Sequence, residues 1–333
     1  TENMQEGLLV IDRYTMVLSV NSSVGKLLKV KEIKTGESVY LLNRSEEFRG
    51  VVGQVLEGKH ENKILRLDGS EIQVIANPVT RENKTEGAVI LLVDVTEKVE
   101  REQLRREFSA NVSHELKTPL TSISGFAEIM QDGFVKDEDV KVFAGRIYKE
   151  AQRLIRLVGD VIRISRLDEG GLPYQWEKLD LYSLTHDIFS TLHEAAEKQE
   201  VHMYMEGGST VLDTVPTIME EVLYNVCDNA VKYNRRGGEV FVRLKDGEDA
   251  VRVNVRDTGI GIPKEDQERI FERFYRVDKS HSKEIGGTGL GLSIVKHGVK
   301  TLNGRLWLNS EPGQGTEIIM EFPKHHMEKE AAE

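Results

Sequence analysis

The chain has 333 residues, 39% hydrophobic and 30% charged, which is typical of a soluble globular protein with two or three domains. Its longest apolar run, Ala88–Val93, is far shorter than the about 20 residues that span a bilayer, so no membrane span is expected. The 56 acidic residues outnumber the 45 basic ones, and the net charge of −11 disfavours nucleic acid as a partner. The single cysteine, Cys227, excludes a disulfide framework and any multi-cysteine metal site.

Residues 1–96 contain short β-branched and apolar segments, which are typical of strands. The expected strands are Gly7–Asp12, Met16–Asn21, His60–Leu67, Ser70–Val79 and Ala88–Val95. Asp68-Gly69 separates the third from the fourth and is a strong signal for a two-residue hairpin. No helix longer than about three turns is indicated. The segment therefore predicts a small α+β domain on an antiparallel sheet.

Residues 97–171 change to a helical period. Apolar residues recur at spacings of three and four before and after a polar loop at Asp132–Asp139, which predicts two long helices in an antiparallel hairpin. Such a hairpin cannot bury its apolar stripe alone, so we expect a homodimer held by a four-helix bundle. The second helix is expected to end at Glu169-Gly170-Gly171, where glycine can adopt the left-handed conformation.

Residues 172–324 combine segments with the alternating pattern of strands and segments with the spacing of helices, which predicts an α/β sandwich. A polar tail follows at residues 325–333. The expected helices are Thr217–Tyr233 and Gly291–Leu302. The expected strands are Glu239–Lys245, Ala250–Arg256, Arg305–Asn309 and Thr316–Phe322. The fold class is thus a multidomain α+β chain of three parts.

The first chemical motif is HELKTPL, which begins at His114 in the first long helix. His114 lies off the apolar stripe, and an exposed imidazole is largely neutral and nucleophilic at pH 7. Glu115 could accept its Nδ1 proton, and Pro119 should kink or loosen the helix one turn later. A zinc site is excluded because Thr118 stands where a second histidine would be needed. Taken alone, the motif favours an exposed helix that carries an ordinary histidine.

The second motif is NVCDNAVKY, residues 225–233. Asn225 and Asn229 lie four residues apart on one helical face, where their amides could bind a hard cation or phosphate, and Lys232 adds a positive charge. A polar helix face explains the same pattern without a ligand.

Two glycine-rich segments follow. DTGIGI begins at Asp257 after a strand, so its carboxylate could accept a hydrogen bond from an exocyclic amine, although a strand-ending turn is the alternative. GGTGLGL begins at Gly286 and opens a helix, an arrangement that suits phosphate. No strand precedes it as a dinucleotide fold requires, and the chain has no Walker A motif. Residues 273–283 carry four basic residues and one acidic residue, which suggests an anionic ligand.

Taken together and in this order, HELKTPL, NVCDNAVKY, DTGIGI, FERFY and GGTGLGL make the chain resemble the sensor histidine kinases of two-component systems. They match that family's H, N, G1, F and G2 boxes, and residues 1–96 resemble a PAS sensor domain. The match is strongest to the membrane-anchored phosphate-starvation and cell-wall-stress sensors. The resemblance implies a PAS domain (1–96), a dimerisation and phosphotransfer hairpin (97–171) and a GHKL (Bergerat) ATP-binding domain (172–324).

The resemblance also implies roles for individual residues. His114 would accept the phosphoryl group, Glu115 would activate it, and Thr118 would position water for dephosphorylation of a response regulator. Arg276, with Arg273 second, would stabilise the transferring phosphoryl. Asn229 would ligate Mg²⁺. The remaining expected contacts to ATP are Asn225, Lys232, Tyr233, Asp257, Gly259, Gly261, Gly287, Thr288, Gly289, Leu290 and Gly291.

Two other functions compete with the kinase. Related GHKL ATPases carry a glutamate four residues before the metal-binding asparagine, as a base for water, and here that position is Asn225. This favours transfer to His114 over hydrolysis. A sensory scaffold that binds ATP without catalysis is disfavoured by the complete set of boxes. The implied partners are a second copy and the receiver domain of a response regulator. The chain begins with Thr1 and has no signal peptide or span. The family resemblance implies that it is the cytoplasmic part of a membrane-anchored sensor.

Overall fold

The computed structural model describes residues 4–30, 33–67, 69–82, 84–169, 174–277 and 287–325. These residues group into two compact units, Thr1–Ser109 and Ala110–Glu333. Several predicted features lie outside the described residues: the turn residue Asp68, the helix end at Gly170-Gly171, Lys279 and Lys283 of the basic segment, Gly286, and the tail beyond His325.

The first unit is built on a five-stranded sheet in which every neighbouring pair is antiparallel, with the order β2-β1-β5-β4-β3. The strands are β1 (Gly7–Asp12), β2 (Val17–Val20), β3 (Glu61–Leu67), β4 (Ser70–Arg81) and β5 (Lys84–Asp94). The predicted hairpin is confirmed, because Leu67 pairs with Ser70. The last strand starts earlier than predicted, since Thr85 still pairs with Thr80 near the hairpin tip.

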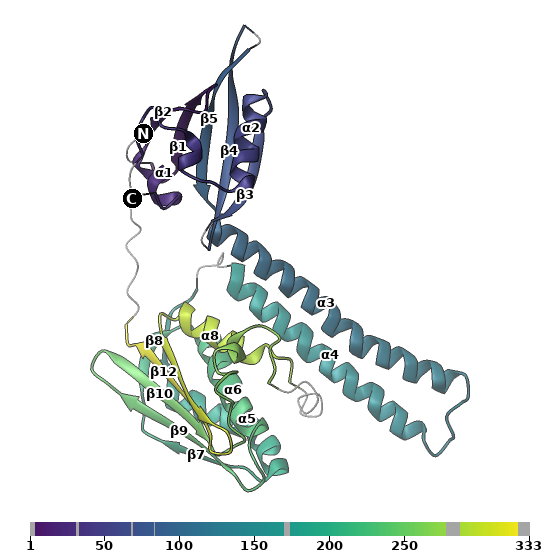
Figure 1. Ribbon diagram of the computed structural model, residues 1–333. Helices are drawn as coiled ribbons and strands as arrows, with labels where there is room; N and C mark the ends of the chain where they lie inside the picture. Colours follow the sequence, from purple (N-terminus) through teal and green to yellow (C-terminus); the bar gives the residue numbers. More distant parts are fainter. Residues whose placement is uncertain are drawn as a thin grey trace. The chain divides into compact units, whose positions relative to one another are not determined.

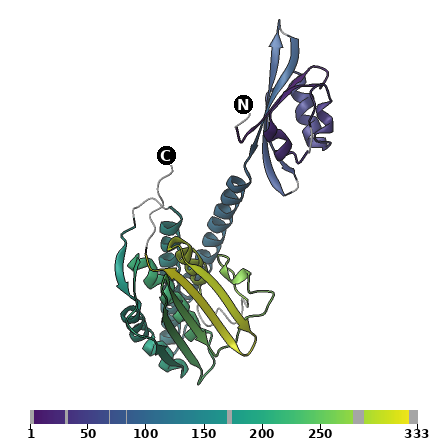
Figure 2. The same cartoon turned by 90° about the vertical axis from the view of Figure 1, so that its left-hand side faces the viewer.

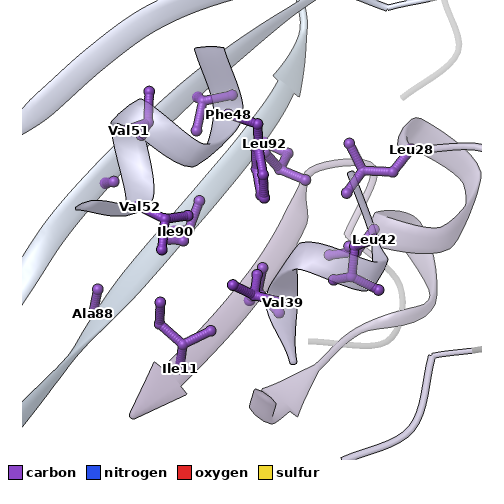
Figure 3. Close-up of a cluster of buried hydrophobic side chains, with 14 of the residues drawn as sticks. Ile11, Leu28, Val39, Leu42, Phe48, Val51, Val52, Ala88, Ile90 and Leu92 are labelled. Atoms are coloured by element: carbon purple, nitrogen blue, oxygen red, sulfur yellow. The ribbon is translucent and has the colours of Figure 1, made fainter. Parts of the chain in front are cut away.

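Two helices, α1 (Ser22–Leu27) and α2 (Glu46–Leu56), and a 3₁₀ turn, η1 (Val39–Leu41), complete the first unit. Helix α2 packs on β3, β4 and β5 through Phe48, Val51, Val52 and Val55, which recur at helical spacing. Figure 3 shows Phe48, Val51 and Val52 in one apolar cluster with Ile90 and Leu92 of the sheet. The Ser45 hydroxyl accepts a hydrogen bond from the Phe48 N–H at 3.2 Å and caps the start of α2.

The two long helices are confirmed as α3 (Thr96–Gln131) and α4 (Val140–Glu169). In the second unit, which begins at Ala110, the two helices run side by side in an antiparallel hairpin (Figure 1). Helix α3 is continuous through Pro119. The rings of Phe126 and Phe143 meet edge to face, with centroids 5.7 Å apart, near the loop that joins the helices. Much of the apolar stripe is exposed in the single chain, including Leu120, Val140 and Val158.

The second unit also contains a five-stranded sheet of order β11-β12-β10-β9-β7. Its strands are β7 (His202–Glu206), β9 (Glu239–Asp246), β10 (Ala250–Asp257), β11 (Arg305–Glu311) and β12 (Gly315–Pro323), and only β7 and β9 among them pair in parallel. A small sheet joins β6 (Glu177–Asp180) to β8 (Val211–Thr214). Helices α5 (Leu181–Gln199), α6 (Pro216–Lys232) and α8 (Gly291–Thr301) lie on one face of the larger sheet, as Figures 1 and 2 show.

Cys227 lies on α6 in the core of the second unit, with 1% of its surface exposed. Burial raises the pKa of its thiol to about 12, and neighbouring Asp228 adds to the shift. None of the helices in the described part of the chain has the length and apolarity needed to cross a membrane.

Candidate functional site

A cavity of about 610 Å³ opens in the second unit, and most of the site residues predicted in the ATP-binding domain line it. Helix α6 and its C-cap contribute Asn225, Asn229, Lys232 and Tyr233, and the end of β10 and the turn after it contribute Asp257 and Gly261. The segment that leads into α8 and the first residue of that helix contribute Gly287, Thr288, Gly289 and Gly291. Arg276 lines it from the segment before the undescribed residues. Three residues predicted here, Gly259, Arg273 and Leu290, do not line the cavity.

Asp257 stands at the end of β10 with only 8% of its surface exposed. Burial raises the pKa of its carboxyl group to about 6, and hydrogen bonds from the backbone N–H groups of Gly259 and Thr316 oppose that shift. Both bonds end on Oδ1, at 2.8 and 3.2 Å, so the second carboxylate oxygen keeps its capacity to accept. The arrangement suits a ligand that donates a hydrogen bond, such as an amine on an aromatic ring.

The two glycines after Asp257 are required by close packing of the turn. Gly261 has a φ of +68°, and a Cβ there would meet the carbonyl oxygen of Glu311 at 2.0 Å. A Cβ on Gly259 would meet the carbonyl oxygen of Tyr233 at 2.3 Å. Gly261 therefore shapes the cavity wall directly, whereas Gly259 acts beneath it by letting the turn approach α6.

The opposite end of the cavity gathers groups that suit phosphate. The side-chain nitrogen of Asn225 donates to the carbonyl of Glu221 at 2.7 Å, and its Oδ1 lies close to Gly291. Lys232 pairs with Asp228 one turn earlier. Helix α8 begins here without a side-chain cap, whereas α2 and α5 are capped by Ser45 and Asp180. Backbone N–H groups at an uncapped helix start are available to bind an anion.

Arg276 provides an additional cation at the cavity. Its Nη2 atom is buried and has no hydrogen-bond partner among the described residues, which is costly for a charged group unless a ligand completes it. Burial lowers the pKa of Arg276, while the Glu115 carboxylate raises it. Arg276 thus lies within electrostatic reach of the predicted phosphoacceptor motif. Tyr233 lies nearby, since its hydroxyl would be 3.0 Å from a Cβ on Gly287.

The predicted phosphoacceptor region lies on α3, outside the cavity. His114 is exposed, and Thr118 donates a hydrogen bond to the carbonyl oxygen of His114 at 3.3 Å. Glu115 is half-buried and accepts a hydrogen bond from Arg153 of α4, with Nη2 and Oε2 3.3 Å apart. The ion pair holds the carboxylate of Glu115 between the two helices of the hairpin.

Residues that the motifs did not indicate form one wall of the cavity. Helix α4 contributes Ile155, Arg156, Gly159, Asp160 and Arg163. Asp160 accepts a hydrogen bond from Thr288 at 2.7 Å, and Arg163 pairs with Glu221 of α6 at 3.2 Å. In the sequence these residues belong to an ordinary helical repeat, so only the fold reveals them. Asp228 also lines the cavity and could have been found, because it stands inside NVCDNAVKY.

Comparison with known proteins agrees with this geometry. Residues 104–170 match the His Kinase A (phospho-acceptor) domain model, and residues 214–326 match the model of the histidine kinase-, DNA gyrase B-, and HSP90-like ATPases. The chain is 33% identical to the sensor protein kinase WalK of Staphylococcus aureus, over 96% of this chain and 79% of that protein. It is 35% identical to WalK of Staphylococcus haemolyticus over 96% of its length, but spans only 54% of that relative.

The fold has matching neighbours among solved structures. Histidine kinase ThkA, solved in complex with response regulator protein TrrA, superposes with a TM-score of 0.53 over 96% of this chain and 95% of that one, at 24% identity. This likeness concerns the fold. Given the WalK relative of which it spans more than two thirds, and the two domain models that match its hairpin and its cavity-bearing region, the chain belongs to the sensor histidine kinase family.

Proposed function

We propose that the chain is an ATP-dependent protein-histidine kinase that phosphorylates itself on His114. The observation that carries this proposal is the position of Arg276, which lines the cavity and also interacts electrostatically with Glu115, the neighbour of His114. A cation between a nucleotide site and an acceptor is what phosphoryl transfer needs, since catalysis there is mostly positioning and charge stabilisation.

ATP fits the cavity with its adenine at Asp257 and its phosphates at α8. The buried carboxylate of Asp257 would accept from the exocyclic amine, beside Gly259 and Gly261. The uncapped N-terminus of α8, with Gly287, Thr288, Gly289, Leu290 and Gly291, would bind phosphate oxygens together with Asn225, Lys232 and Tyr233. The unpartnered Nη2 of Arg276 supports this orientation, because phosphate would satisfy it.

Mg²⁺ fits the same end of the site. In the described part of the chain, no group of three or more His, Cys, Asp or Glu side chains is arranged to hold a metal. Mg²⁺ does not require such a cluster, since it is commonly held by one or two side chains together with substrate phosphates and water. Asn229, whose amide lies near the start of α8, is the proposed protein ligand. The ion would supply neutralisation of phosphate charge.

The proposed reaction uses residues of α3. The Nε2 atom of His114 attacks the γ-phosphorus, the bond to the β-phosphate oxygen breaks, and ADP leaves. Glu115, oriented by Arg153, accepts the Nδ1 proton. Arg276 stabilises the charge on the transferring group, with Arg273 second. An aspartate of a response regulator receiver domain would then take the phosphoryl group from His114.

Hydrolysis of ATP by water is the competing activity. Asn225 stands at the position where GHKL ATPases have a catalytic glutamate, and its side-chain nitrogen is held by the Glu221 carbonyl. An amide cannot act as a general base, so ATP bound here would await His114. A noncatalytic scaffold is the other alternative, and it predicts no covalent product at all.

The decisive experiment is phosphoryl transfer from [γ-³²P]ATP in the His114→Gln variant. We expect loss of label transfer to the protein and unchanged ATP affinity, because His114 lies outside the cavity. The matched control is His186→Gln, which alters an exposed histidine of α5 and should leave labelling unchanged. Normal labelling of the His114→Gln variant would disprove the assignment.

We further propose dephosphorylation of the regulator as a second activity, with Thr118 positioning water. Thr118→Ala should keep autophosphorylation while slowing loss of phosphate from the receiver domain. Thr118→Ser, which retains a hydroxyl, should preserve both. An equal loss of both activities in Thr118→Ala would contradict the separation of roles.

The domain organisation completes the proposal. Residues 1–96 would form the PAS sensor domain, which the five-stranded antiparallel sheet with its two short helices supports. Residues 97–171 would dimerise through a four-helix bundle, which the exposed apolar stripe of α3 and α4 supports. Residues 172–324 would be the GHKL ATP-binding domain. Light scattering should give the mass of a dimer, and Val158→Lys, on the stripe, should shift the mass towards that of the monomer.

A further inference from the structure

Helix α4 of the hairpin places a carboxylate in the wall of the proposed nucleotide cavity. Asp160 lines the cavity with 16% of its side chain exposed, and its Oδ2 accepts the hydrogen bond of the Thr288 hydroxyl at 2.7 Å. Thr288 belongs to the glycine-rich segment at the start of α8. The carboxylate therefore lies beside the end of the cavity where phosphates are proposed to bind.

The basic residues around Asp160 neutralise the negative charge of its carboxylate only in part. Arg163 lies 3.4 Å from its Oδ1 but also pairs with Glu221 at 3.2 Å, and it is half exposed. Lys232 attracts Asp160 and Asp228 repels it. Burial is the main influence and raises the pKa of Asp160, which means that its negative charge is poorly solvated. Additional negative charge nearby would be unfavourable.

The contact between α4 and the start of α8 is also what closes this side of the cavity. Helix α4 packs against α8, Thr288 is held by Asp160, and Glu221 of α6 is held by Arg163. These contacts hold α4 of the hairpin against α8 and α6 at the edge of the cavity. A ligand that disfavours Asp160 in this position also disfavours the docked arrangement.

We propose that Asp160 makes docking of α4 and binding of a polyphosphate nucleotide antagonistic, so that the negative charge of the nucleotide releases α4 from the start of α8. The proposal rests on the proposed function, because it assumes that the cavity binds ATP. Coupling of this kind is reciprocal: whatever weakens docking by repulsion must itself bind less tightly while α4 is docked. Adenosine has no phosphate and no negative charge, so its binding should not affect docking of α4.

Substitution of Asp160 by asparagine isolates the charge, because the asparagine carbonyl can still accept the hydrogen bond of Thr288. Binding of adenosine, ADP and a non-hydrolysable ATP analogue would be measured by calorimetry in the presence of Mg²⁺. We expect Asp160→Asn to tighten the analogue by about tenfold, ADP by less, and adenosine not at all. Asp187→Asn is the matched control, since it removes an exposed carboxylate of α5 that does not line the cavity.

A second measurement follows docking itself. Hydrogen exchange of backbone amides in Gln152–Ile164 should increase when the analogue binds the wild-type chain, and should increase less in Asp160→Asn. Adenosine should leave this segment unchanged in both proteins.

The binding measurements distinguish failure of the electrostatic coupling from failure of ATP binding itself. Equal effects on all three ligands would overturn the electrostatic coupling and indicate a structural role. Weaker binding of the analogue by Asp160→Asn would also overturn it, in favour of Asp160 as a metal ligand. Failure of the wild-type chain to bind any of the ligands would contradict the proposed function itself.

Discussion

The two five-stranded sheets of the molecule are used differently. In the first unit, the sheet and α2 enclose a core cluster that is apolar throughout, from Leu9 to Leu92. In the second unit, the sheet and its helices leave a cavity of about 610 Å³, with Asp257 buried at the end of a central strand. Complete packing maximises stability, whereas an open cavity with a poorly solvated carboxylate sacrifices some stability for binding. Substitutions in the two regions should therefore change stability by different amounts.

The largest effect is expected for a cavity in the first core. Phe48 is fully buried on α2, so Phe48→Ala should lower the free energy of unfolding of the first unit by about 3–5 kcal/mol. Leu18→Ala, at a side chain that is 57% exposed, should change it by less than about 0.5 kcal/mol. Urea denaturation followed by circular dichroism measures both. Equal losses of unfolding free energy in Phe48→Ala and Leu18→Ala would contradict the view that packing of this core stabilises the first unit.

An intermediate effect is expected from Asp257 and should depend on pH. Burial raises its folded-state pKa to about 6 from 3.8, so the native chain binds more protons than the unfolded chain between these values. Stability attributable to Asp257 should therefore fall as pH rises from about 4 to about 6, by at most about 3 kcal/mol. The difference in unfolding free energy between wild type and Asp257→Asn should show this slope. A difference that does not vary with pH would show that the carboxylate is well solvated.

The smallest effect concerns the helix starts. Ser45→Ala removes the cap of α2 and should lower stability of the first unit by about 1 kcal/mol, while Ser45→Asn should largely retain it. Helix α8 has no such side chain to lose, and its start is proposed to be capped by phosphate. Thermal unfolding of the two variants measures the difference. If Ser45→Ala were as stable as the wild type, the contrast between the capped and uncapped helix starts would lose its energetic basis.

Local pattern was sufficient for most of the elements. The expected helices at Thr217–Tyr233 and Gly291–Leu302 agree with α6 and α8 within a residue or two, because their periods and flanking turns are clear. Helix α2 was not predicted as such, although Phe48, Val51, Val52 and Val55 follow the spacing of an amphipathic helix. The early start of β5 was missed because its first residues are polar and pair only through the backbone.

The site residues likewise fall into those that the sequence motifs predicted and those that only the fold reveals. Motifs indicated Asp257, Asn225 and Arg276, whose neighbours in sequence also serve the cavity. They did not indicate Asp160, which belongs to a different helix and reaches the cavity only because α4 packs against α8. Contacts between elements distant in sequence depend on tertiary packing, which no local period encodes.

The burial of Cys227 makes its thiol a probe of opening of the core of the second unit. With its thiol shielded in α6 and its pKa raised to about 12, the folded chain offers almost no thiolate to an alkylating reagent. The rate at which this one thiol reacts therefore reports how often the core around α6 opens. If the cavity binds a nucleotide as proposed, bound nucleotide would slow alkylation of Cys227. Unfolding of the first unit alone would not expose this thiol, because Cys227 lies in the second unit.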